Sequence, residues 1–264
     1  RACRYDLKQL RPQLRRIASA GGEVGVHGLD AWLDVDAGCR EWERVSQTIG
    51  ASGLGVRMHW LNFDENSPAI LDQAGFNYDT TVGYAETVGY RAGTLQVYRP
   101  LGVTNLLELP LHVMDTALFY RVCLNLREED ARRLVRNLMD DAERIGGVLT
   151  INWHDRSIAP ERLWDDFYLQ LLRELKSRGA WLAPAGQGVA WFRKRRSAAV
   201  ECMRVGASVL RIRARMETAD TLPGLRIRIN KPRARSIAEP MAARTAADFV
   251  DVPFDSTTKL DIAL

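Results

Sequence analysis

Residues 146 to 155 read GGVLTINWHD, two glycines followed by a short apolar run that ends in His154 and Asp155. A run of this length between glycines and polar residues is typical of a core strand in a parallel sheet. Apolar residues at three- and four-residue spacing predict amphipathic helices on either side of it, over 127–145 and 160–178. The order is therefore helix, strand, helix, with a polar pair at the end of the strand.

Short apolar segments that end in polar residues recur earlier in the chain. They are EVGVHG, ending at His27; GLGVRMHW, ending in Arg57, His59 and Trp60; FNYDTT, with Asp79; and NLLELPLHVMD, ending at Asp115. Helices are predicted between them, over 7–20, 39–49 and 67–75. This alternation up to about residue 193 favours an α/β fold with a mostly parallel sheet. Ligands of such folds bind beyond the carboxyl ends of the strands, where these polar residues should meet.

Three of the four histidines, His27, His59 and His154, fall at predicted strand ends. His112 lies inside an apolar run and is interpreted as structural, while Arg91 in the loop GYRAG joins the polar set. Histidines and carboxylates at one rim can bind a divalent metal or perform acid–base chemistry. The alternative is that each strand-end histidine is an ordinary hydrogen-bonded residue.

Beyond Ser197 the helical period is lost, and apolar residues alternate with polar residues or arginine. Two domains are predicted: an α/β domain over 1–196 and a small β-rich domain over 197–264. The stretch 231–247, rich in Pro, Arg and Ala, is predicted to be a loop.

Composition narrows the classes of function. The net charge of +4 is mild, and the basic run 193–196 is interpreted as a solvated helix end, so nucleic acid is not an expected partner. The four cysteines show no zinc-ribbon or CxxC spacing, which favours a reducing compartment, the cytoplasm. No apolar run reaches membrane-spanning length, and no signal-peptide pattern or GxSxG nucleophile motif is present.

Four patches in order resemble the motifs of the polysaccharide deacetylases, carbohydrate esterase family 4, and in particular the divergent branch of bacterial surface-polysaccharide biosynthesis. The resemblance covers roughly residues 5 to 193. GGEVGVHG resembles the second motif, with His27 as a metal ligand. GVRMHW resembles the third, in which Arg57 orients the catalytic base, and FNYDTT the fourth, in which Asp79 steadies that arginine. LTINWHD resembles the fifth, with His154 as general acid.

The chain departs from the family pattern at three places. The second histidine of the second motif is replaced by Ala31, so His59 is expected to take over as metal ligand, with Asp30 as the other candidate. The third motif, Arg-x-Pro-Tyr, reads Arg57-Met58-His59-Trp60 here. The first motif, an Asp-Asp pair, is not matched. One strand and its helix need on the order of 30 residues, so a shortened N-terminus is expected.

The resemblance implies a distorted β/α barrel and metal-dependent N-deacetylation of an acetamido sugar, in lipopolysaccharide or related biosynthesis. His27 and His59 would bind the metal, for which zinc is expected, and Arg91 and Trp60 would contact the carbohydrate. His154, Arg57 and Asp79 are the expected catalytic residues, with Asp115 holding the imidazole of His154 in its tautomer. The alternative is a non-catalytic, sugar-binding relative of these enzymes.

Overall fold

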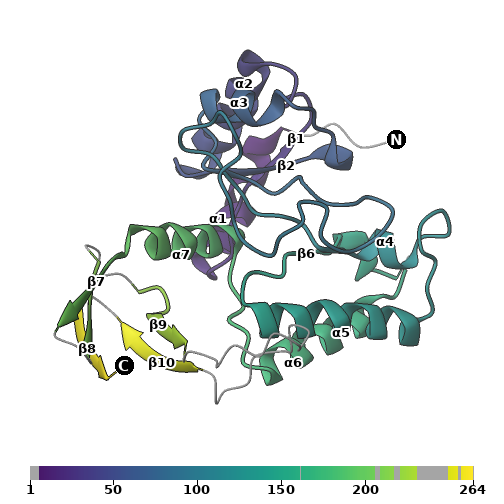
Figure 1. The fold of residues 1–264 in the computed structure, drawn as a ribbon. Helices are drawn as coiled ribbons and strands as arrows, with labels where there is room; N and C mark the ends of the chain where they lie inside the picture. Colours follow the sequence, from purple (N-terminus) through teal and green to yellow (C-terminus); the bar gives the residue numbers. More distant parts are fainter. Residues whose placement is uncertain are drawn as a thin grey trace. The chain divides into compact units, whose positions relative to one another are not determined.

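The computed structural model describes residues 6–160, 162–205, 209–216, 221–230, 249–254 and 257–263. The chain divides into two compact units, Arg1–Val189 and Ala190–Leu264 (Figure 1). The predicted boundary after residue 196 and this division both fall within one helix, α7 (Ala185–Ser197). The two units are described separately below.

The first unit contains a parallel sheet of four short strands in the order β1-β2-β3-β4. The strands are β1 (Val26–Gly28), β2 (Gly55–Met58), β3 (Tyr78–Asp79) and β4 (Leu107–Glu108). Their register pairs His27 with Arg57 and Asp79 with Glu108. Because directly paired residues of neighbouring strands point to the same face, each pair of polar side chains lies together.

A second parallel pair joins β5 (Val113–Met114) to β6 (Ile151–Asn152). The segment NLLELPLHVMD, predicted as one strand, is therefore split between two sheets, and that prediction was wrong. Pro110 lies at the break, where its missing N–H cannot continue a ladder. Backbone bonds from Leu109 N–H to Asp79 O (2.8 Å) and from Leu111 N–H to Val82 O (3.0 Å) join the crossing segment to the region around β3.

The helices have the following bounds. They are the short 3₁₀ turns η1 (Leu7–Leu10), η2 (His59–Leu61) and η3 (Asp155–Ser157), and the α-helices α1 (Arg11–Ser19), α2 (Val35–Ile49), α3 (Ser67–Gln73), α4 (Asp115–Phe119), α5 (Glu128–Ile145) and α6 (Asp165–Ser177). Helix α2 begins earlier than predicted because the Asp34 side chain caps it, accepting from Ala37 N–H at 2.8 Å. Gly50, at φ 75°, ends it in a left-handed conformation.

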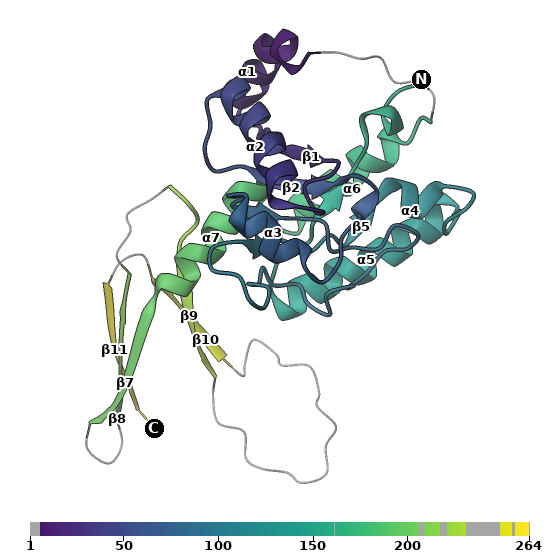
Figure 2. The ribbon, with the colours of Figure 1, turned by 90° about the horizontal axis from the view of Figure 1, so that it is seen from above.

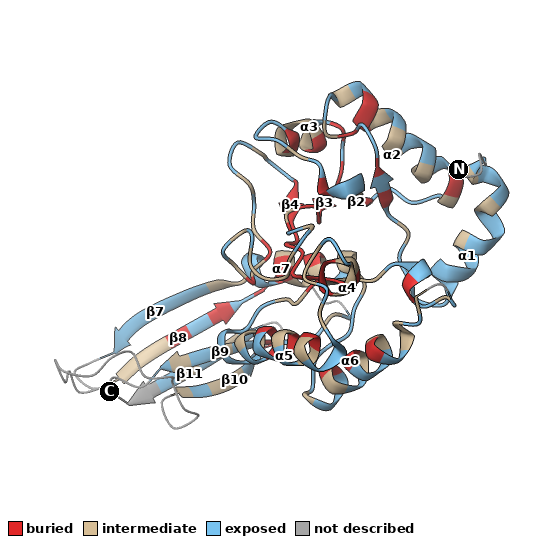
Figure 3. Cartoon of the chain, turned by 90° about the vertical axis from the view of Figure 1, so that its right-hand side faces the viewer, coloured by how far each residue is buried: buried red, intermediate tan, exposed pale blue. Residues whose placement is uncertain are grey.

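Two apolar clusters form the core of the first unit. Helices α2 and α3 lie along one side of the four-stranded sheet, where Val56, Leu71 and Phe76 are buried (Figures 1 and 3). Helices α5 and α6 lie side by side and bury Val135, Leu171 and their neighbours against the strand pair. In the opening stretch Thr150 is buried, whereas Ile151 and Asn152 are only half-buried, so β6 is less enclosed than predicted.

Close packing of α2 on α3 depends on Gly38. A Cβ at this position would lie 2.7 Å from the Cβ of Ala74, closer than two side-chain carbons can approach. We expect Gly38→Ala to lower the free energy of unfolding by about 1–3 kcal/mol, as overpacking does. Gly188 in α7 is a matched control, because a Cβ there meets nothing within 4 Å. Gly188→Ala should raise stability by up to about 1 kcal/mol through helix propensity. Urea unfolding of both variants checks this, and equal effects would contradict it.

The second unit contains antiparallel sheets, shown side-on in Figure 2. One has the order β11-β8-β7 and the other pairs β10 with β9. The strands are β7 (Ala199–Val205), β8 (Val209–Arg215), β9 (Leu225–Asn230), β10 (Phe249–Phe254) and β11 (Thr257–Ala263). Ala214, Met216, Leu225 and Phe254 form a small buried cluster. The predicted loop 231–247 lies outside the described residues.

The basic run 193–196 at the end of α7 was predicted to be a solvated helix end. In the structure it is only partly solvated. Lys194 is only 8% exposed, and its Nζ donates to Leu222 O at 3.3 Å. A long aliphatic stem can be buried when its charged end reaches a carbonyl, which explains the difference.

The observed architecture is thus mixed α/β, with parallel strands in the first unit and antiparallel strands in the second. Among the described strands the parallel ones form a four-stranded and a two-stranded piece, so they do not show the closed barrel that was expected. No helix in the described ranges combines the length and apolar character needed to cross a membrane.

Candidate functional site

His27 and His59 lie together, as predicted. The Nε2 atom of His27 is 2.9 Å from the Nδ1 atom of His59, and the two rings meet edge to face. His27 is the central residue of β1, and His59 follows the last residue of β2, the neighbouring parallel strand. Both histidines are exposed, so the pair opens to solvent at the carboxyl end of the sheet.

The environment of His27 favours its neutral form. Desolvation lowers the pKa of His27, and the charges of His59, Arg57 and His154 lower it further. The three predicted rim histidines are thus brought within electrostatic reach of one another. A neutral imidazole has a free lone pair and can bind a metal, whereas a protonated one cannot.

Arg57 is held by three hydrogen bonds beneath this rim. Its Nε donates to Thr80 O (3.2 Å), its Nη2 to Thr80 Oγ1 (3.3 Å) and its Nη1 to Asn152 Oδ1 (2.9 Å). The last bond connects the four-stranded sheet to β6, because Asn152 is the final residue of β6. Asn152 precedes His154 by two residues. Arg57 therefore fixes the spacing between the strand ends that carry His59 and His154.

Asp79 acts on Arg57 through its charge and not through a hydrogen bond. The carboxyl group of Asp79 is buried and accepts from the hydroxyl of Thr81. It also shares a hydrogen bond with Glu108, which is equally buried and accepts from Val82 N–H at 2.9 Å. The predicted role of Asp79 in steadying the arginine is thus indirect, and Thr80 and Asn152 supply the direct contacts.

Burial is the largest cause that raises the pKa of Asp79, to about 6, although hydrogen bonds and Arg57 oppose it. Burial and the charge of Asp79 raise the pKa of Glu108 well above its usual range. Ionising both of two directly opposed carboxyl groups beside a single arginine costs free energy, because the like charges repel each other. The pair therefore holds a proton that two separated carboxyls would release.

This proton makes stability depend on pH. Burial raises the folded pKa of Glu108 well above its usual 4.5 and that of Asp79 from 3.8 to about 6. The stability that the protonated pair contributes is therefore complete below the ordinary pKa values and is lost as pH rises through the raised ones. Glu108→Gln keeps an acceptor for Val82 N–H and a donor for Asp79 without needing that proton. We expect it to raise the free energy of unfolding at pH 8 by on the order of 1 kcal/mol and to change it little at pH 4.

Urea unfolding at the two pH values measures the effect of Glu108→Gln. Glu65→Gln is the matched control, because Glu65 is exposed in a loop. A Glu108→Gln variant that is destabilised equally at both pH values would show that the pair holds no such proton.

Asp115 and His154 form a second polar pair, as predicted. The Nδ1 atom of His154 is 2.6 Å from Asp115 Oδ1, and His154 N–H donates to Asp115 Oδ2 at 2.8 Å. The carboxyl group is fully buried, yet the hydrogen bonds from His154 and Ser157 outweigh burial and lower the pKa of Asp115. An ionised Asp115 holds the proton of His154 on Nδ1. The imidazole remains 43% exposed, which leaves Nε2 available at the rim.

Trp60 projects from the rim beside His59. Its side chain is 80% exposed, and the two rings have centroids 5.4 Å apart. Trp60 and Leu61 have φ values of 59° and 57°, a left-handed conformation that costs free energy in residues with a Cβ. Strain of this kind is concentrated at functional sites, so the exposed indole is a candidate ligand contact.

Arg91 and His112, the other two residues discussed in the sequence analysis, make their contacts elsewhere than at the histidine pair. Within the described ranges, Arg91 donates to Gly83 O at 2.8 Å and lies over the rings of Phe63 and Tyr84, and none of these contacts is with a rim histidine. His112 is buried, accepts from Thr150 N–H through Nδ1 (3.1 Å) and contacts Thr94 O through Nε2 (3.2 Å). The structural interpretation of His112 is confirmed.

The geometry bears directly on metal binding. Two zinc-bound imidazole nitrogens, each roughly 2.0–2.1 Å from the ion, lie about 3.3 Å apart at a tetrahedral angle. The separation between His27 and His59 is close to this value. No group of three possible ligands occurs among the described residues, so Asp30 does not join the pair. The amide of Asp30 instead donates to Glu41 Oε1 at 2.8 Å.

Sequence reasoning missed Asn152, Glu108, Thr80 and Ser157. Asn152 precedes His154 by two residues, so the two-residue period of an extended strand could have placed it on the same side. Glu108 is a charge inside an apolar run, which is itself a signal of a buried ionisable group. Thr80 and Ser157 carry no comparable signal.

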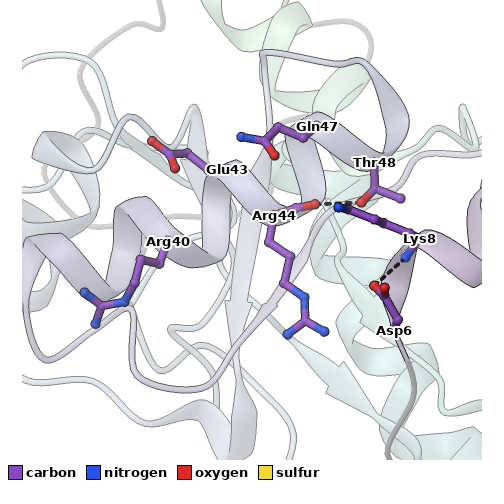
Figure 4. Close-up of a pocket in the computed structure, with 7 residues that line it drawn as sticks. All are labelled: Asp6, Lys8, Arg40, Glu43, Arg44, Gln47 and Thr48. Atoms are coloured by element: carbon purple, nitrogen blue, oxygen red, sulfur yellow. Dashed lines mark hydrogen bonds between the residues drawn. The ribbon is translucent and has the colours of Figure 1, made fainter.

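A separate surface pocket of about 320 Å³ lies between η1 and α2 (Figure 4). Its lining residues are Asp6, Lys8, Arg40, Glu43, Arg44, Gln47 and Thr48. Charges of both signs line it, and none of the predicted site residues does. The chemistry described above therefore belongs to the strand ends and not to this pocket.

Comparison with known proteins shows a similarity of fold to a solved structure. No protein-family model matches the sequence, and no curated protein matches it significantly. A solved structure from Mycobacterium smegmatis, described as a "putative polysaccharide deacetylase", superposes with a TM-score of 0.55 at 20% identity. The match covers 71% of this chain and 68% of that one. At this identity the similarity concerns the fold, which is consistent with the family resemblance of the motifs.

Proposed function

We propose that this chain is a carbohydrate N-deacetylase that hydrolyses the amide of an N-acyl amino sugar. One observation carries the proposal: a histidine pair and an Asp115–His154 pair are set around Arg57 at the strand ends of one unit. The fold similarity to a solved protein described as a "putative polysaccharide deacetylase" supports it. We place the substrate within surface-polysaccharide biosynthesis, such as that of lipopolysaccharide, on the resemblance of the motifs alone.

His27 and His59 are proposed to hold a divalent metal, with zinc the first choice. Their nitrogens lie 2.9 Å apart, near the about 3.3 Å expected for two imidazole ligands of one zinc ion, and the environment of His27 favours its neutral form. When bound, such an ion would polarise the amide carbonyl and acidify a water molecule. Catalytic zinc sites usually use three protein ligands. Among the described residues we assign only two, and no general base.

His154 is proposed as the proton donor. In hydrolysis, water adds to the carbonyl carbon, the C–N bond breaks, and the departing nitrogen needs a proton. With Nδ1 bonded to Asp115, the imidazolium form of His154 would present its other proton on the exposed Nε2. Arg57 and Asn152 would keep this strand end at a fixed distance from the histidine pair.

Trp60 is proposed to bind the sugar ring, and Arg91 to contact the carbohydrate further along the surface. An exposed aromatic face packs against the C–H face of a sugar, and burying this area favours binding. We further propose that the two parallel sheet pieces form the wall of a distorted barrel. The Arg57–Asn152 hydrogen bond and the backbone bond from Leu111 to Val82 support this arrangement.

The second candidate is a non-catalytic carbohydrate-binding protein. The observation that favours it is that the described residues supply two converging metal ligands and not three. Such a protein would keep the exposed Trp60 as a carbohydrate contact but would not release acid from its ligand.

Acetate release distinguishes the two candidates. The chain is incubated with zinc and N-acetylglucosamine oligomers, and acetate and free amine are quantified together. A deacetylase should release both in equal amounts, whereas a binding protein should show quenching of tryptophan fluorescence without acetate.

Trp60→Ala should weaken oligomer binding about 10-fold, by analogy with the loss of one aromatic contact. Binding unchanged by Trp60→Ala would remove the indole from the site.

A further inference from the structure

Asp115 receives more hydrogen bonds than its contact with His154 requires. Its Oδ1 atom accepts from Thr116 N–H at 2.7 Å as well as from His154, and the Ser157 side chain is a further hydrogen-bond partner. Ser157 is fully buried and is the last residue of η3, the turn that follows His154. A carboxylate held by several donors cannot rotate, and neither can the imidazole bonded to it.

Ser157 is in turn held by Arg162. The guanidinium Nη1 donates to Ser157 Oγ at 3.0 Å. Because Arg162 is donor only, the hydroxyl oxygen accepts this bond, and its single proton remains for Asp115. The hydrogen bond from Arg162 therefore directs the hydroxyl proton of Ser157 toward Asp115.

Arg162 has a fixed position of its own. Its guanidinium lies over the rings of Tyr120, 4.6 Å to the centroid, and Trp164, 5.3 Å to the centroid. It also donates to the hydroxyl of Tyr120. The backbone bond from Trp164 N–H to Ser157 O (2.9 Å) closes the intervening loop, so Arg162 returns to the serine.

We propose that Ser157 and Arg162 are positioning residues that fix the Asp115–His154 pair in one tautomer. They act through Asp115 and touch no reacting atom. The chain Arg162–Ser157–Asp115–His154 joins the loop before α6 to the rim, and its functional meaning rests on the proposed role of His154 as proton donor.

Long-range proton–nitrogen NMR of the four histidine rings tests the proposal without any substrate. His154 is assigned by the signals missing in His154→Ala. In the unmodified chain His154 should be protonated on Nδ1. Ser157→Ala should shift part of the population to the Nε2-protonated tautomer. Arg162→Met, which keeps an unbranched stem against Tyr120 and Trp164, should act in the same direction. Arg156→Ala is the matched control, since Arg156 is exposed in the same turn.

Steady-state kinetics give the second readout. Ser157→Ala should lower kcat about tenfold with KM unchanged, the worth of one hydrogen bond to a charged group. An unchanged tautomer in both Ser157→Ala and Arg162→Met overturns the inference, as does a rise in KM without loss of kcat. A chain without acetate release would refute the proposed function, and the NMR result would still decide whether the two residues position His154.

Discussion

Replacing His154 with alanine is expected to lower the rate of deacetylation by roughly 10²–10⁴-fold while leaving zinc affinity nearly unchanged. A positioned general acid contributes this much when it protonates a poor leaving group. Zinc binding should survive because His154 is bonded to Asp115, whereas the proposed ligand pair is formed by His27 and His59. Acetate release and zinc titration on the same preparation measure the two quantities.

His112→Gln is the matched control for this experiment. His112 is buried and bridges Thr94 and Thr150, so its replacement should lower the melting temperature without changing turnover per folded molecule. If His154→Ala behaves in the same way, His154 is a structural residue at the strand end. Loss of zinc in His154→Ala would instead show that the acid and the ligand have been exchanged in our assignment.

The sequence allowed the helix–strand order and the proximity of His27 to His59 to be predicted, for a simple physical reason. Parallel strands bring their carboxyl ends to one edge, so residues at successive strand ends meet even when the strands are far apart in the chain. The contact between Asp115 and His154 follows from the same rule. These predictions needed only the position of each polar residue relative to its apolar run.

The support beneath the rim could not be predicted in the same way. Arg57 was assigned to Asp79, but its hydrogen bonds go to Thr80 and Asn152. The choice depends on side-chain directions and on the separation of two sheets, neither of which a local pattern contains. The division of NLLELPLHVMD into β4 and β5 was missed for a related reason: an apolar run has the same appearance whether it serves one sheet or two.

The second prediction with a large expected effect concerns zinc binding by the proposed ligand pair, His27 and His59. We expect one zinc site per chain that is absent in His27→Ala and in His59→Ala, with affinity reduced by more than roughly 100-fold in each. Nε2 of His27 and Nδ1 of His59 are only 2.9 Å apart, and either substitution leaves a single imidazole of this proposed ligand pair. One imidazole cannot reproduce the chelation that two preorganised nitrogens provide.

Zinc titration by calorimetry should measure this site as a difference between variants. In the described part of the chain, the free cysteines Cys39, Cys123 and Cys202 are themselves soft ligands, so total zinc uptake alone is not decisive. Uptake through the cysteines is common to all variants and cancels in the comparison, and His112→Gln should retain the site because His112 lies in the core. If His27→Ala and His59→Ala bind as much zinc as the unmodified chain, the histidine pair is a hydrogen-bonded contact only. The metal-dependent mechanism would then lose its basis in the described residues.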